Sequence, residues 1–130
     1  MEVTSCAPLL NVADIEASLA FWRDLLGFEV ATRFESGGRL AFASLQAGEA
    51  RLMLNAHGGD PAARKARPGY TDAVIYFSVA SVRRLVDDLR AKGFDAPEPT
   101  REDYGVDEVL VRDPDGYEIG YTSPVGADAA

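Results

Sequence analysis

The chain has 130 residues, enough for one globular domain that buries roughly two thirds of its unfolded surface without a metal or disulfide. Its 13 basic and 21 acidic residues give a net charge of −8, which argues against a nucleic-acid partner and favours cationic ligands, or else serves solubility alone. With one cysteine, no leader-like segment and no apolar run near the roughly 20 residues that span a bilayer, we expect a cytoplasmic protein with no membrane partner.

The first element is an apolar strand that leads into a capped helix. Residues 7–12 are apolar, and Asp14 is a good N-cap for the helix that follows. Apolar side chains then recur at three- and four-residue spacing until Gly27 stops the helix; they are Ile15, Leu19, Trp22, Leu25 and Leu26. This spacing places Trp22 in the core or at a dimer interface.

Three strands are predicted next. They cover residues 29–34, 39–45 and 50–55, with turns at Ser36-Gly37-Gly38 and at residues 46–49. Residues 57–71 are rich in glycine, proline and charge and have no periodicity, so we expect a linker.

The second half repeats the plan of the first. A strand over 74–79 is followed by the Ser81 cap, an apolar stripe up to Leu89, and Gly93 as the stop. Strands are predicted over 94–96, 108–112 and 117–122, and Asp113-Pro-Asp-Gly116 is a type I turn signal before the last. Matching the valines and the glycines of the two halves gives offsets of 67 and 66 residues. The alternative is that the two halves are unrelated, since any two strand–helix units have similar sequence patterns.

The repeat predicts an α+β fold of two βαβββ modules in tandem. Each module is expected to be a curved mixed sheet with a helix on its convex face, and the two to be facing halves of one cavity. Module one covers residues 5–56, the linker 57–71, module two 72–124 and a tail 125–130. All of it forms a single domain.

Several motifs resemble those of one known family. They are Val12-Ala-Asp14, Ser18 followed by Phe21-Trp22 and Leu26-Gly27-Phe28, and above all Asp113-Pro-Asp-Gly-Tyr117. This pattern resembles the vicinal-oxygen-chelate superfamily, which includes glyoxalase I, extradiol dioxygenases and bleomycin-resistance proteins. The resemblance covers residues 5–124 and implies the glyoxalase/bleomycin-resistance fold, but it does not choose among the members.

The resemblance also implies where a metal would be bound. The four ligand positions fall at Ala7, Met53, Val74 and Gly120, whereas a divalent ion needs several imidazole or carboxylate ligands. The only histidine, His57, lies past its strand and is expected at the surface. We therefore predict that the protein binds no metal and no cofactor. We also expect free space at the position of the ion, because these four side chains replace bulkier ligands.

Alternation along the strands then assigns the cavity-facing side chains, since residues two apart share a face. This set mixes apolar and hydrogen-bonding groups, as small-molecule pockets do. The predicted ligand-binding residues are Asn11, Phe42, Arg51, Met53, Asn55, Tyr76, Tyr104, Glu108 and Glu118. Tyr104 and Gly105 are expected in a loop at the mouth, and Arg51 and Glu118 either bind a charged ligand or pair together.

Three functions are compatible with this pattern. The first is a metal-independent binding protein of the bleomycin-resistance type that sequesters an aromatic or amphipathic natural product. The resemblance implies a homodimer. The sequence identifies no catalytic residue for this function. The second is an enzyme of lyase, isomerase or epimerase type that uses Glu118, Glu108, Tyr104 or His57 for acid–base chemistry, or an atypical metal site. The third is a ligand sensor with the same pocket.

Overall fold

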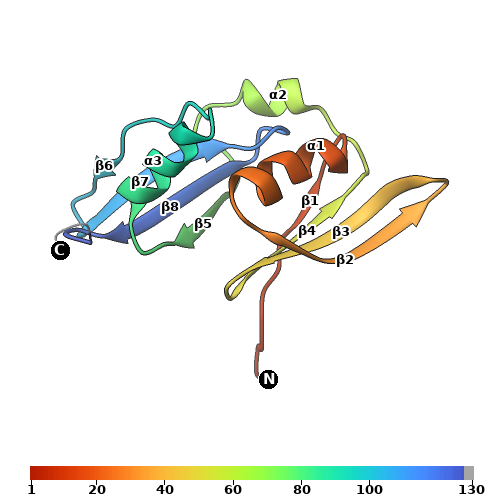
Figure 1. The fold of residues 1–130 in the computed structure, drawn as a ribbon, viewed down its shortest axis with the longest axis horizontal. Helices are drawn as coiled ribbons and strands as arrows, with labels where there is room; N and C mark the ends of the chain where they lie inside the picture. The colour runs from red at the N-terminus through yellow and green to blue at the C-terminus, as the bar shows by residue number, and fades with distance from the viewer. Residues whose placement is uncertain (128–130) are drawn as a thin grey trace. The chain divides into compact units, whose positions relative to one another are not determined.

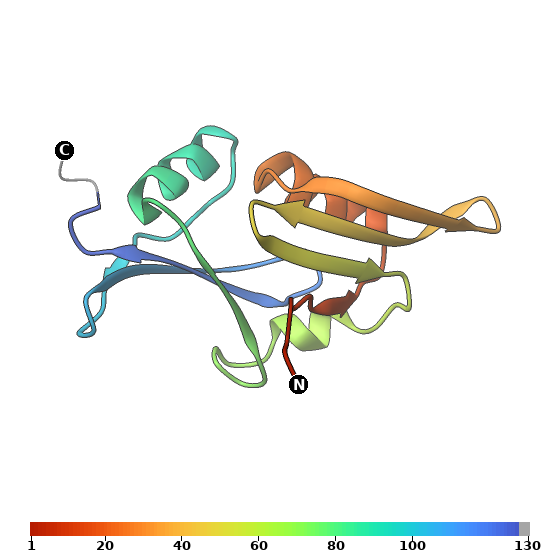
Figure 2. The same cartoon turned by 90° about the horizontal axis from the view of Figure 1, so that it is seen from below.

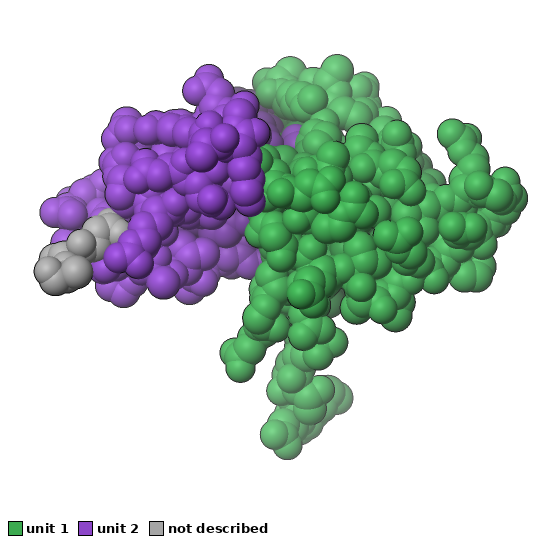
Figure 3. Space-filling view, in the orientation of Figure 1, with its two compact units in different colours: residues 1–66, 114–116 green, residues 67–113, 117–130 purple. Residues whose placement is uncertain are grey.

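The computed structural model describes residues 1–127 and divides the chain into two compact units (Figure 3). Unit 1 contains residues 1–66 and 114–116, and unit 2 contains residues 67–113 and 117–127 of the described chain. Each unit has a four-stranded mixed sheet with a helix packed on one face (Figures 1 and 2). The predicted α+β fold of two βαβββ modules is confirmed. Residues 128–130 of the predicted tail lie outside the described residues.

Unit 1 has the strand order β1-β4-β3-β2, with β1 parallel to β4 and the other pairs antiparallel. As expected, the Asp14 side chain caps the first helix by accepting the N–H of Glu16 at 3.0 Å. The elements are β1 (Leu9–Asn11), α1 (Ile15–Leu19), η1 (Ala20–Leu25), β2 (Glu29–Ser36), β3 (Arg39–Ala47), β4 (Ala50–Asn55) and α2 (Pro61–Lys65).

The first helix differs from the prediction in its second half. It is α-helical only over Ile15–Leu19, and η1 over Ala20–Leu25 is a π-helix. The N–H of Leu26 reaches back five residues to the carbonyl of Phe21 at 3.0 Å. Both Phe21 and Trp22 are buried within this π-helical segment. Apolar spacing of three and four residues does not reveal such a segment.

The segment 57–71, predicted as a linker, contains a helix, α2, that the sequence pattern did not predict. The Asp60 side chain accepts the N–H of Ala63 at 3.1 Å, and Pro61 occupies the first turn. Five residues are too few to show an apolar period. The Asp-Pro pair was the available signal, since proline is favoured at the first helical position.

Unit 2 has the strand order β5-β8-β7-β6, with β5 parallel to β8. The predicted strand over 94–96 is wrong: Phe94 instead closes the helix, donating its N–H to the Leu89 carbonyl at 2.9 Å. The strand that follows the helix is β6, which begins at Thr100, after Pro97 and Pro99. The elements are β5 (Val74–Ser78), α3 (Val82–Ala91), β6 (Thr100–Arg101), β7 (Val106–Arg112) and β8 (Glu118–Pro124).

In each unit the core lies between the helix and one face of the sheet. Alternation along the strands assigns nine apolar residues to the helix side of the sheets. Six of them are buried, whereas Ile75, Phe77 and Val79 are half-buried. The buried ones are Leu10, Val12, Leu52, Leu54, Ile119 and Tyr121. The opposite faces carry the predicted site residues. Over residues 1–127, no helix has the length and apolar character needed to cross a membrane.

Candidate functional site

The predicted site residues lie on the faces of the two sheets that point away from the helices. On the first sheet, Asn11, Asn55 and Phe42 are direct register partners across β1, β4 and β3. Met53 lies in the next row and Arg51 in the row after that. The second sheet carries Glu108, Glu118 and Tyr76, and Tyr104 follows β6. The two groups are described separately below.

The open face of the first sheet carries apolar side chains beside polar ones such as Asn11, Asn55 and Arg51. Leu9 is 47% exposed and Phe34 is 62% exposed, while Phe42 and Met53 beside them are half-buried. A hydrogen bond of 2.6 Å joins the hydroxyl groups of Thr32 and Ser44 in the same rows. Exposed apolar side chains that adjoin in this way mark a surface for binding an apolar molecule or another protein.

On the second sheet, the Tyr76 ring lies directly on Gly120, its register partner. A Cβ added at Gly120 would be 2.4 Å from Cε1 of Tyr76. The expectation of free space at Gly120 is therefore wrong, because the ring occupies it. Only glycine allows an aromatic side chain to cross a neighbouring strand this closely.

The residues at the four positions implied for a metal do not fit a divalent ion. Ala7, Val74 and Gly120 offer no side-chain donor, and Met53 offers only a thioether. The Tyr76 ring covers Gly120. Within residues 1–127, no group of three or more His, Cys, Asp or Glu side chains is arranged to hold an ion.

Glu108 is the central polar group of the second sheet. Its side chain is only 4% exposed. The hydrogen bond from Tyr76 to Glu108 is the largest cause of a raised pKa of the Tyr76 phenol, followed by burial and a hydrogen bond with Tyr70. The Glu108 carboxylate would repel an ionised Tyr76 phenolate. The Tyr76 hydroxyl therefore stays protonated at neutral pH and can donate a hydrogen bond.

Tyr70 is brought to this site by Glu118. The N–H of Tyr70 donates to Oε1 of Glu118 at 2.8 Å. Tyr70 has a left-handed φ of 60°. Arg112 lies 3.7 Å from the same carboxylate oxygen and donates to the Arg67 carbonyl at 2.9 Å. Glu118 therefore fixes the segment before β5. Sequence reasoning missed Tyr70, because its position depends on a residue 48 positions later.

Tyr104 lies in the turn between β6 and β7, where Gly105 has a φ of 88°. The Tyr104 side chain is 69% exposed. Partial desolvation, then the charges of Glu108 and Glu102, and then Tyr70, raise the pKa of its phenol. The Tyr104 phenol is therefore influenced by the charges of Glu108 and Glu102.

A cavity of about 290 Å³ opens beside these groups. It is lined by Tyr70, Pro97, Glu98, Thr100, Glu102, Glu108, Val109 and Leu110. We call this cavity, together with Tyr76 and Tyr104, the tyrosine–glutamate pocket. Oε1 of Glu108 is buried there and has no hydrogen-bond partner among residues 1–127. The structure thus brings together the predicted Tyr76, Tyr104 and Glu108 and adds Tyr70.

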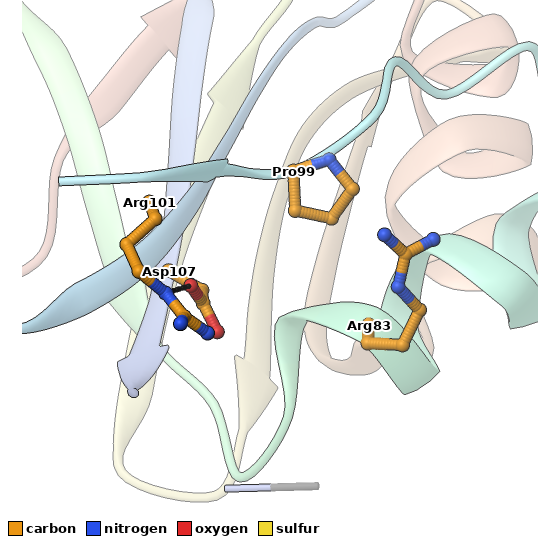
Figure 4. Close-up of a pocket in the computed structure, with 4 residues that line it drawn as sticks. All are labelled: Arg83, Pro99, Arg101 and Asp107. Atoms are coloured by element: carbon orange, nitrogen blue, oxygen red, sulfur yellow. Dashed lines mark hydrogen bonds and ion pairs between the residues drawn. The ribbon is translucent and has the colours of Figure 1, made fainter. Parts of the chain in front are cut away.

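Two other cavities offer less chemistry. One, of about 340 Å³ in unit 2, is lined by Arg83, Pro99, Arg101 and Asp107 (Figure 4). Arg101 pairs with Asp107 at 3.1 Å, and Arg83 pairs with Glu98 at 2.8 Å, so both cations are already neutralised. The other, also about 340 Å³, lies in unit 1 between the start of α1 and β3.

Comparison with known proteins gives a consistent family and fold. Residues 4–121 match the model of the Glyoxalase/Bleomycin resistance protein/Dioxygenase superfamily. No functionally curated protein matches the chain.

Solved structures with the same fold have different functions. TnmS3, an antibiotic binding protein from Streptomyces sp. CB03234, is 18% identical with a TM-score of 0.71, over 95% of this chain and 97% of that one. The bleomycin-binding protein of Streptomyces verticillus, complexed with copper(II)-bleomycin, is 22% identical with a TM-score of 0.69, over 95% and 98%. A lactoylglutathione lyase from Agrobacterium tumefaciens is 18% identical with a TM-score of 0.68, over 95% of both. At these identities the likeness establishes the fold alone.

Proposed function

This chain belongs to the Glyoxalase/Bleomycin resistance protein/Dioxygenase superfamily, and we propose that within it the protein binds a small aromatic or amphipathic molecule without a metal ion. The supporting observation is the tyrosine–glutamate pocket. Three tyrosines there adjoin a carboxylate that is buried at 4% exposure. Aromatic walls around a few placed polar groups are the usual composition of a small-molecule site.

Metal independence is supported by the donor set. The four positions at which the family resemblance implies ligands hold Ala7, Met53, Val74 and Gly120, and the Tyr76 ring covers the last of these. A divalent ion requires several nitrogen or oxygen ligands that converge. Binding by stacking and hydrogen bonds needs none of them.

Sequestration of a natural product is the role we propose for this binding. Two of the proteins with the same fold are an antibiotic binding protein and a bleomycin-binding protein. An open pocket that binds without reaction suits protection by sequestration. We also propose that the protein acts as a homodimer, because the open face of the first sheet exposes Leu9 and Phe34.

An acid–base enzyme is the second candidate. Its support is the contact between Glu108 and Tyr76, which places two proton-carrying groups side by side. The raised pKa of Tyr76 makes this phenol a poor base at neutral pH but leaves it a proton donor. Turnover of a bound molecule, lost in Glu108→Gln, would favour the enzyme over the binding protein.

The test begins with metal analysis of the untagged protein, followed by thermal unfolding with a panel of aromatic natural products that includes metal-free bleomycin. A ligand at a hundred times its Kd adds about 2.7 kcal/mol of stability, which raises the Tm by several degrees. Tyr104→Ala should reduce the shift, whereas Val3→Ala, at an exposed site in unit 1, should not. A stoichiometric transition metal, or no shift with any compound, would contradict the proposal.

A further inference from the structure

Glu108 is a carboxylate in a place where an unpaired charge is costly. Its side chain is 4% exposed, and its Oε1 atom is buried without a hydrogen-bond partner among residues 1–127. In the same part of the chain, no Arg or Lys forms an ion pair with it. Buried polar groups are nearly always paired, so this oxygen is suited to a donor from outside the chain.

The tyrosines around Glu108 are suited to a cation. Tyr70 and Glu108 line the same cavity. Hydrogen bonding to Glu108 is the largest cause of the raised pKa of Tyr76, and the charge of Glu108 also raises the pKa of Tyr104. Tyr70, Tyr76 and Tyr104 are 61%, 47% and 69% exposed, so their rings are accessible to a ligand. Tyrosine rings attract ammonium groups through their electron-rich faces.

The remaining charges in the pocket do not oppose a cation. Glu102 also lines the cavity, where its Oε1 accepts the Thr100 hydroxyl at 2.8 Å. Glu98 is paired with Arg83 and Arg90. The pocket therefore keeps a local excess of negative charge, in a chain whose net charge is −8.

We propose that the tyrosine–glutamate pocket binds a protonated primary or secondary amine attached to an aromatic ring. The ammonium N–H donates to Oε1 of Glu108, and the charge lies against the rings of Tyr70, Tyr76 and Tyr104. A cavity of about 290 Å³ accommodates a single ring with a short amine-bearing arm. This inference rests on the proposed function and narrows its ligand to one chemical class.

The test compares 2-phenylethylamine, a cation at neutral pH, with 2-phenylethanol, which has the same shape and no charge. Both are titrated into the metal-free protein and followed by backbone amide chemical shifts. Because a charge-assisted hydrogen bond is involved, the amine should bind at least about tenfold more tightly. The ratio should fall to near one in Glu108→Gln and remain unchanged in Glu35→Gln, which alters an exposed glutamate of β2 in unit 1.

A second variant covers the case in which Glu108→Gln does not fold. Tyr104→Leu removes one ring at an exposed turn and should weaken the amine several-fold with little effect on the alcohol. Equal binding of amine and alcohol, or an unchanged ratio in the folded variants, overturns the ammonium inference. If neither probe binds but other aromatic compounds do, the inference fails and the proposed function stands. If no aromatic compound binds the metal-free protein, both fail.

Discussion

Gly120 shows how much of the site depends on one missing side chain. Without a Cβ there, the Tyr76 ring lies across β8, and its hydroxyl reaches Glu108. In Gly120→Ala the added methyl would be 2.4 Å from the ring, so we expect Tyr76 to move and lose its hydrogen bond. Its phenol should then ionise near the usual pKa of 10.0 instead of above it.

Spectrophotometric titration of the tyrosines measures this change. At a pH of about 11, Gly120→Ala should show about one more ionised tyrosine than the wild type. The control is the same substitution in a Tyr76→Phe background, where it should change nothing. An identical count in the wild type and Gly120→Ala would mean that the ring tolerates the methyl without moving.

Asp115 is a second residue whose environment defines its role. It is 3% exposed and accepts the Ala13 N–H at 2.8 Å and the Ser18 hydroxyl at 3.3 Å, both within unit 1. Asp115→Ala removes the partner of the buried Ser18 hydroxyl and of the Ala13 N–H, and should lower the free energy of unfolding by about 2 kcal/mol. Urea denaturation measures this loss, with the exposed Asp95→Ala as control. A loss no larger than that of the control would show that water replaces the carboxylate.

At the scale of elements, Glu98 ties the helix α3 to the segment before β6. It pairs with Arg83 at 2.8 Å and with Arg90 at 3.0 Å, and these hydrogen bonds lower its pKa from 4.5 to about 2. A lowered carboxyl pKa stabilises the fold above the unfolded value, and this contribution is lost as the pH falls through the folded value.

The stability difference between wild type and Glu98→Gln should therefore be constant above the unfolded pKa of 4.5 and shrink as the pH falls toward about 2. Because both partners are exposed, the whole effect is small and weakens with salt. Thermal unfolding of the two proteins across this pH range gives the measurement. A difference that stays constant down to the lowest pH would contradict the role of these ion pairs.

Most strands and their faces were predictable because alternation is a local pattern, although the strand predicted over 94–96 was wrong. Leu52, Leu54 and Ile119 are buried as their parity required, and Ser81 caps α3 by accepting the Arg84 N–H at 3.0 Å. The helix α2 within residues 57–71 was not predicted, because it has only five residues. Periodicity cannot identify so short a helix.

The candidate site was less predictable because its geometry is non-local. Tyr76 and Gly120 were both singled out, but their contact depends on the register of β5 and β8. Tyr70 reaches the site only through Glu118. Local sequence patterns indicate which face a residue occupies, and pairing between distant strands decides which residues meet.

At the scale of the whole molecule, we expect two chains to associate. The open face of the first sheet exposes Leu9 and Phe34, which adjoin Phe42 and Met53 across the strands. Covering these side chains removes apolar surface from water, whereas the charge of −8 on each chain opposes association at low salt. Light scattering at moderate ionic strength should therefore give twice the 14.0 kDa mass of one chain.

Phe34→Glu tests whether this face makes the dimer. A charge at a side chain that is 62% exposed should leave the fold intact but oppose burial in an interface, so the mass should fall to that of one chain. Val125→Glu, at an apolar side chain of unit 2 that is 40% exposed, is the matched control and should remain dimeric. A wild-type monomer would refute the dimer itself. A dimer that survives Phe34→Glu would place the interface elsewhere on the chain.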